Sequence, residues 1–310
     1  MYATKTTGAF DLNRLAKLAF PKGKVRMVLD TDTYNEIDDQ FAVTYALLSP
    51  ERLKVEALYA APFYNDLSTG PADGMEKSYE EILRILERLH VPSTGFVYRG
   101  STEYLPDAIT PVKSDAARDL VERALASDAD DPLYVVAIGA PTNVASAILM
   151  EPKILHHIVV VWLGGNGLHW PDTREFNMVQ DIHASRVILD SGVPLVYVPC
   201  MGVTSHLLTS LPEIRDSIGG YGEIGDYLVE VFERCHGDHF GYSRVIWDIA
   251  TIAYFMNEEW VPSSLVHSPI LNDGFTYSFD STRHLIRAVN YIHRDPVFTD
   301  LFTKIRQHRV

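Results

Sequence analysis

The sequence has few cysteines, a deficit of basic residues and no long hydrophobic run. Cys200 and Cys235 are its two cysteines and form no CxxC motif, which favours free thiols in a reducing compartment over a disulfide framework. The 27 Lys and Arg face 41 Asp and Glu, a net charge of −14, which argues against nucleic acid as a partner because such binding needs clustered basic residues. No stretch approaches about 18 uncharged apolar residues, and the N-terminus lacks the apolar core of a signal peptide. We therefore expect a cytoplasmic protein with no membrane partner.

Short runs of β-branched residues alternate with segments of helical periodicity, which is the pattern of a parallel sheet with connecting helices. Several of the strand candidates are apolar throughout, as expected for strands that are covered on both faces. Strands are predicted at residues 25–29, 55–60, 133–138, 158–163 and 195–198. Helices are predicted at residues 37–48, 76–89, 116–126, 143–149, 181–190 and 247–256.

No Pro- or Ser-rich linker, internal repeat or low-complexity tract divides the chain. We therefore expect one domain over residues 1–310, with the α/β class and an open, mostly parallel, doubly wound sheet. Residues 205–246 are richer in glycine and charge than the preceding part of the chain. They are predicted to form a helical insertion or lid in the C-terminal third.

Four aspartates surround the end of the first predicted strand. Asp30 and Asp32 are two positions apart, so both can face the crevice at the carboxyl ends of parallel strands, where ligands bind. Asp38 and Asp39 begin the next helix, where the helix dipole stabilises negative charge. Four carboxylates in one cleft repel one another, and a hard divalent cation such as Ca²⁺ or Mg²⁺ would relieve that repulsion. The alternative is a solvated acidic turn whose aspartates cap the helix.

The segment DTDTYNEIDD at residues 30–39 resembles the DxDPGxDD signature of the calcium-dependent, inosine-uridine preferring nucleoside hydrolases. Here the connection is two residues longer and the Pro-Gly is absent. GAPTN at residues 139–143 is similar to the family's GPLTN turn, and the Gly-Gly-Asn at residues 164–166 with Glu-Phe-Asn at 175–177 is similar to its GG…N…EFN segment. Trp-Asp at residues 247–248 stands where the family commonly has His-Asp. The resemblance covers roughly residues 25 to 256.

The resemblance implies hydrolysis of the N-glycosidic bond of ribonucleosides to ribose and free base. It implies a water activated by Ca²⁺, with Asp32 as the general base, and a homodimer or homotetramer. Asp30 would orient the loop. The metal ligands would be Asp32, Asp39, the carbonyl of Thr142, and Asp248. The substrate-binding residues would be Asp38, Asn166, Glu175, Asn177 and Trp247.

The acid that protonates the leaving base has no clear candidate in the sequence. Trp247 replaces the family's histidine and cannot donate a proton at neutral pH, although it could stack on a purine. His236, His239 and Tyr242, in the predicted insertion, are the other candidates. The departure at Trp247 therefore leaves this role open.

Two other functions are compatible with parts of the sequence. Asp30 and Asp32 after a hydrophobic strand also resemble the nucleophile and acid/base of Mg²⁺-dependent haloacid dehalogenase-type phosphatases. Tyr34 stands where that pattern has a small residue, and no later Lys followed by an acidic pair is evident. The longer first loop and the missing histidine would also suit a nucleoside- or pentose-binding protein of the same fold that performs no catalysis.

Overall fold

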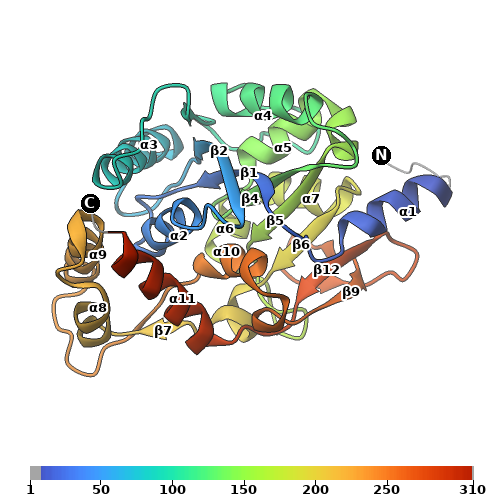
Figure 1. Ribbon diagram of the computed structural model, residues 1–310. Coiled ribbons are helices and arrows are strands. Elements are labelled where there is room, and N and C mark those ends of the chain that lie inside the picture. The colour runs from blue at the N-terminus through green and yellow to red at the C-terminus, as the bar shows by residue number, and fades with distance from the viewer. Residues whose placement is uncertain (1–7, 309–310) are drawn as a thin grey trace.

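The computed structural model describes residues 8–308, and side chains from residue 12 onward. Its centre is an eight-stranded sheet in which only the last strand is antiparallel to its neighbour (Figure 1). In spatial order the strands are β3 (Val97–Arg99), β2 (Leu53–Ala60), β1 (Val25–Thr31), β4 (Leu133–Ala137), β5 (Ile158–Leu163), β6 (Leu195–Val198), β12 (Leu285–Val289) and β9 (Ser263–His267). The predicted α/β class and mostly parallel sheet are confirmed.

Helices cover both faces of this sheet and create two hydrophobic cores. One core includes α2 (Asp38–Leu47), α3 (Pro71–Arg88), α8 (Leu211–Ile218), α9 (Gly222–Arg234), α10 (Ile249–Met256) and α11 (Arg294–Gln307). The other includes α4 (Asp115–Leu125), α5 (Thr142–Met150) and α7 (Ile182–Asp190). Side chains of β4 alternate between them, since Tyr134 and Val136 belong to the first core and Val135 to the second. This sharing explains why the central strands are apolar throughout.

The remaining elements are short or peripheral. Helix α1 (Gly8–Lys17) lies beside the β12 end of the sheet (Figure 1). Helix α6 (Phe176–Gln180) precedes α7, and an irregular turn spans Cys200–Thr204, in which the backbone of Met201 and Gly202 is not helical. Two-residue strands form the pairs β7 (Leu208–Thr209) with β8 (Arg244–Val245) and β10 (Ile270–Leu271) with β11 (Tyr277–Ser278). Short 3₁₀ helices span Pro152–His156 and Glu258–Trp260.

All five predicted strands are present, with differences at their ends. Strand β1 continues to Thr31, so Asp30 lies inside the strand and not after it as predicted. Helix α3 begins at Pro71, five residues before the predicted start, because proline is favoured in the first helical turn. Gly74 permits this early start, since a Cβ there would lie 2.0 Å from the Phe63 carbonyl oxygen. Helix α10 begins at Ile249, which leaves Asp248 in the N-cap position.

The predicted helical insertion contains α8 and α9, joined to the rest of the chain through β7 and β8. These helices pack on each other, and both contact α11. The role of residues 205–246 as a lid remains a prediction, as does the assignment of the whole chain to one domain. Among residues 8–308, none of the helices combines the length and apolar character that a membrane span requires.

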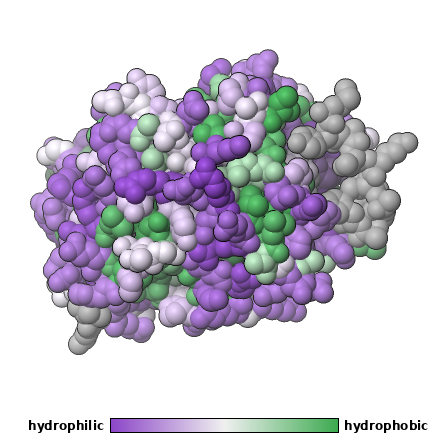
Figure 2. Space-filling view, turned by 90° about the horizontal axis from the view of Figure 1, so that it is seen from above, coloured by the Kyte–Doolittle hydropathy of each residue, from purple (hydrophilic) through white to green (hydrophobic). Residues whose placement is uncertain are grey.

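The connections between strands reverse direction at the centre of the sheet. From β1 the chain builds β2 and β3 on one side, and it then returns to place β4, β5 and β6 on the other. Such a switch point opens a crevice at the carboxyl ends of the two central strands, here β1 and β4. The surface seen from above in Figure 2 is mostly hydrophilic with scattered hydrophobic areas, as expected for helices whose apolar sides face a sheet.

Candidate active site

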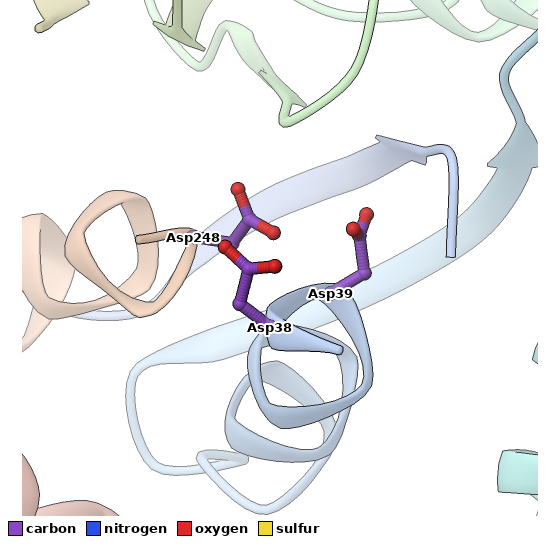
Figure 3. Close-up of side chains that lie close together, drawn as sticks. All are labelled: Asp38, Asp39 and Asp248. Atoms are coloured by element: carbon purple, nitrogen blue, oxygen red, sulfur yellow. The ribbon is translucent and has the colours of Figure 1, made fainter. Parts of the chain in front are cut away.

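Three aspartates from two elements meet beside the switch point. Asp38 and Asp39 are the first residues of α2, and Asp248 immediately precedes α10 (Figure 3). One carboxylate oxygen from each lies within 4.8 Å of the others, and all three residues are buried. The backbone N–H of Trp247 donates to Asp38 Oδ2 at 3.1 Å. The hydroxyl of Thr31 donates to Asp39 Oδ1 at 2.5 Å, which joins the triplet to the end of β1.

Asp32 follows β1 directly and lies next to this triplet. Both of its carboxylate oxygens are buried, and neither has a hydrogen-bond partner among residues 8–308. Burial first, and then the charges of Asp39 and Asp38, raise its pKa well above the usual range. Its carboxylate faces Gly139, where a Cβ would lie 2.8 Å from Oδ1. A buried carboxylate without partners is costly, so this group needs a cation, a proton or a ligand.

The carboxylates of the triplet are disfavoured in their ionised form. Burial is the main cause, and it raises the pKa of Asp39 to about 7. The pKa values of Asp38 and Asp248 lie well above their usual range, raised by burial and then by neighbouring carboxylates. Arg244 opposes this shift at Asp38 without reversing it. A hard divalent cation would remove the repulsion, and an all-oxygen donor set suits Ca²⁺ or Mg²⁺. The residues present therefore fit a divalent cation.

The side chains of Asp30 and Thr142 make hydrogen bonds to residues outside the triplet. Asp30 is fully buried in β1, and its Oδ1 accepts a hydrogen bond of 2.7 Å from Asn143 Nδ2. Burial raises the pKa of Asp30 to about 7. Thr142 is the first residue of α5, and its hydroxyl donates to Asp181 Oδ2 at 2.8 Å. These contacts involve only the side chain of Thr142, and the predicted ligand is its carbonyl oxygen.

A cavity of about 200 Å³ opens next to the carboxylates. Every residue predicted to bind substrate lines it, whereas Asp32 and Thr142 do not. The lining consists of Asn35, Glu36, Asp38, Asp39, Ile138, Leu163, Asn166, Arg174, Glu175, Phe176, Asn177, Cys200, Met201, Trp247 and Asp248.

The Glu-Phe-Asn segment builds the wall of this cavity. The Glu175 carboxylate accepts hydrogen bonds from the N–H groups of Asn177 at 2.9 Å and Gly165 at 2.7 Å, and burial raises its pKa to about 7. Asn177 Nδ2 donates to the carbonyls of Ile138 at 2.9 Å and Leu163 at 3.0 Å, so it ties the ends of β4 and β5 together. Both hydrogens of that amide are therefore used, and its Oδ1 is the atom left to contact a ligand.

Asn166 is likewise engaged with the neighbouring backbone. Its Oδ1 accepts from the Met201 N–H at 3.2 Å, and its Nδ2 donates to the Asp172 carbonyl at 3.1 Å. The amide thus holds the turn after β5 against the segment after β6. One Nδ2 hydrogen and one lone pair of Oδ1 are not used by these two bonds, and both could contact a sugar hydroxyl.

An ion pair at the cavity rim was not predicted from the sequence. Arg244, at the end of the insertion, donates from Nη2 to Glu36 Oε2 at 2.7 Å. Glu36 belongs to the loop that is two residues longer than the family signature, and it lines the cavity. The pair therefore connects the loop before α2 with the segment that carries Trp247 and Asp248. The extra acidic residue in the loop was the sequence signal that could have indicated it.

The structure does not bring the predicted proton donors to the cavity. His236 stacks on Tyr242 with ring centroids 4.1 Å apart, and His239 Nε2 lies 2.9 Å from the Glu233 carbonyl oxygen. None of these three candidates lines the cavity. Trp247 does line it and is half-buried.

A family and a curated relative that match this chain are both described as nucleoside hydrolases. The family described as inosine-uridine preferring nucleoside hydrolase matches residues 27–290. The pyrimidine-specific ribonucleoside hydrolase RihA of Klebsiella pneumoniae (strain 342) is 28% identical over 265 residues, which are 75% of this chain and 80% of that protein.

Solved structures show the same fold at lower identity. A purine-preferring ribonucleoside hydrolase from Gardnerella vaginalis has a TM-score of 0.73 at 19% identity, over 92% of this chain and 99% of its own. The effector protein XOO4466 has a TM-score of 0.67 at 16% identity, over 98% of this chain and 100% of its own.

Proposed function

The chain belongs to the inosine-uridine preferring nucleoside hydrolase family, and we propose that the buried carboxylates described above carry out that family's reaction, with Asp32 as the general base. The enzyme hydrolyses the N-glycosidic bond of ribonucleosides. The observation that carries the assignment of residues is the buried triplet of Asp38, Asp39 and Asp248, next to a carboxylate at Asp32 whose oxygens are free.

Asp32 is suited to accept a proton because nothing in the described chain occupies its oxygens. The reaction passes through an oxocarbenium-like ribosyl cation, and a water must attack the anomeric carbon as the base leaves. Asp32 takes a proton from that water as the new C–O bond forms. The surrounding carboxylates stabilise the positive charge that develops on the sugar.

Ca²⁺ is the cation we propose, held by Asp32, Asp39, Asp248 and the carbonyl of Thr142. When bound, Ca²⁺ would lower the pKa of the attacking water and orient it. Asp38, Asn166, Glu175 and Asn177 would bind the ribose hydroxyls. Vicinal hydroxyls need paired donors and acceptors, which carboxylate and amide oxygens and amide N–H groups offer.

Trp247 is proposed to support the leaving base by stacking. Its half-buried indole lines the cavity, where the histidine of many family members would stand. An aromatic face against a purine would favour protonation of the base by solvent. Trp247→Ala should then lower kcat/KM for inosine more than for uridine, and an equal loss for both would contradict this role. The names of the relatives differ on base preference, so this comparison also tests which base is preferred.

The phosphatase alternative is not favoured by the geometry. Its nucleophile would be Asp30, whose side chain is fully buried in β1 and hydrogen-bonded to Asn143. A homodimer or homotetramer in the cytoplasm, acting in purine or pyrimidine salvage, is the setting that we propose. Its support is the resemblance and the two free cysteines. The mass of the protein in solution tests the oligomer.

Release of free base from inosine, uridine, adenosine and cytidine tests the proposed reaction. Each nucleoside is incubated with the protein in Ca²⁺ and in EDTA. Release that requires Ca²⁺ supports both the reaction and the cation. Binding of these nucleosides without any cleavage in Ca²⁺ would instead support the non-catalytic binding protein.

A further inference from the structure

Arg174 is the one basic residue among the cavity-lining residues of the described chain, 8–308. The same lining includes five carboxylates, from Glu36, Asp38, Asp39, Glu175 and Asp248. A neutral nucleoside and a divalent cation account for the carboxylates, but neither offers the Arg174 guanidinium a negatively charged partner. The guanidinium adds one positive charge to a cavity lining that otherwise carries carboxylates.

The guanidinium of Arg174 is held in place without being neutralised. Its Nη2 donates to the Gly274 carbonyl at 3.1 Å, and its Cζ lies 5.0 Å from the centre of the Phe275 ring. No carboxylate within the described residues lies at ion-pair distance from it. Arg186 contacts the same β10–β11 hairpin, but its charge is neutralised, because its Nη2 pairs with Asp273 at 2.5 Å. Arg174 thus keeps an oriented charge and several free N–H groups.

Arg174 lines the cavity beside Glu175, which is proposed to bind the ribose, and it does not belong to the triplet of Asp38, Asp39 and Asp248. Glu175, its neighbour, points inward and bonds the Gly165 N–H, whereas Arg174 is exposed. The cavity volume of about 200 Å³ is below the roughly 300–1,000 Å³ of common ligand pockets. A further substituent on a bound nucleoside must therefore project through the mouth. An anion there would meet Arg174, and the carboxylate at the rim, Glu36, is already paired with Arg244.

We propose that Arg174 binds an anionic substituent on the sugar of the substrate, so that the chain acts preferentially on phosphate monoesters of ribonucleosides. The planar N–H fork of arginine matches phosphate oxygens better than any other side chain. This proposal rests on the proposed hydrolase function and adds a binding site to it. In the reaction the C1′–N bond breaks, water supplies the new C1′–O bond, and a proton goes to the base. The phosphate ester is unchanged, and the products are ribose phosphate and free base.

The test compares inosine with its 5′-, 3′- and 2′-monophosphates in Ca²⁺, by following release of hypoxanthine. At least one ester should have a kcat/KM about ten-fold or more above that of inosine. Arg174→Ala should lower that ratio by roughly 10- to 100-fold, the worth of charge-assisted hydrogen bonds. Arg174→Lys should retain part of it, and Arg186→Ala should leave it unchanged. A ratio at or below one for all three esters, or a ratio that Arg174→Ala does not change, would overturn the proposal.

Equilibrium binding separates this proposal from the hydrolase assignment. If neither inosine nor its esters are cleaved, calorimetry still reports whether a monophosphate binds more tightly than inosine, and whether Arg174→Ala removes the difference. Tighter binding that depends on Arg174 supports the anion site even then. Equal affinities for inosine and its esters would mean that the protein has no phosphate site. A preference for the ester that EDTA abolishes and Arg174→Ala does not would mean that the cation binds the phosphate. Either result would overturn the proposal.

Discussion

The crowding of buried carboxylates predicts a specific link between pH, Ca²⁺ and stability. The folded state raises the pKa of Asp39 from 3.8, and that of Glu175 from 4.5, each to about 7. One unit of pKa corresponds to about 1.36 kcal/mol, so the raised pKa of each group alone changes the free energy of unfolding by about 3 to 4 kcal/mol across this pH range. Because the pKa of each group is higher in the folded state than in the unfolded state, the contribution of that group to stability is fully present below its unfolded pKa. It is lost as the pH rises from about 4 to about 7.

Removal of the cation should expose this dependence. In EDTA, we expect the melting temperature to fall by several degrees or more between pH 5 and pH 8. Ca²⁺ binds only ionised carboxylates, so its stabilising effect should be small at pH 5 and largest at pH 8. Calorimetric melting at four pH values, in Ca²⁺ and in EDTA, measures both effects.

A variant at Asp248 sharpens this measurement. Asp248→Asn removes one of the mutually repelling carboxylates but keeps the shape of the side chain. In EDTA at pH 8 it should be more stable than the parent protein, and its response to Ca²⁺ should be much weaker. The reasoning would be refuted if the metal-free parent melted at the same temperature at pH 5 and pH 8, or if Ca²⁺ stabilised it equally at both.

Two substitutions test the surroundings of the aspartates. Gly139→Ala would place a Cβ 2.8 Å from Asp32 Oδ1 and 3.2 Å from the Ala61 Cβ, so turnover should fall at least ten-fold and overpacking should also lower the melting temperature. Gly237→Ala, whose Cβ would meet nothing within 4 Å, is its control, and equal turnover in the two variants would contradict the close contact. Asn143→Ala removes the hydrogen-bond partner of buried Asp30. It should lower the free energy of unfolding, measured in urea, by about 1–3 kcal/mol. An unchanged urea midpoint would contradict a stabilising role for this hydrogen bond.

Local sequence was sufficient for the central part of the fold. The apolar runs located five strands of the sheet, and helical periodicity located α2 with Asp38 and Asp39 at its start. Strands β3, β9 and β12 were not predicted. They lie at or near the sheet edges, where strands are short or only partly buried and give a weak signal. The first strand was predicted too short because a buried aspartate, Asp30, is unusual inside a strand.

The contacts that complete the site could not be found by local patterns. Glu36 and Arg244 are 208 positions apart, and only the folded chain shows that they pair. The two hydrogen bonds from Asn177 to neighbouring strands also depend on tertiary structure. The motif resemblance indicated which residues surround the cavity. It could not indicate that Arg174 lies unpaired at its mouth, because that depends on the hairpin at Gly274.

The role of Asp32 is tested most directly by comparing Asp32→Asn with Asp30→Asn in a base-release assay on inosine with saturating Ca²⁺. Both changes replace a buried aspartate by an isosteric amide, and the two positions are two residues apart. Asp32→Asn should lose at least 10³-fold in kcat if it is the base that activates water, whereas Asp30→Asn should lose far less because its Oδ1 can still accept from Asn143. Equal and small losses in the two variants, with melting temperatures preserved, would contradict the assignment of Asp32 as the catalytic base.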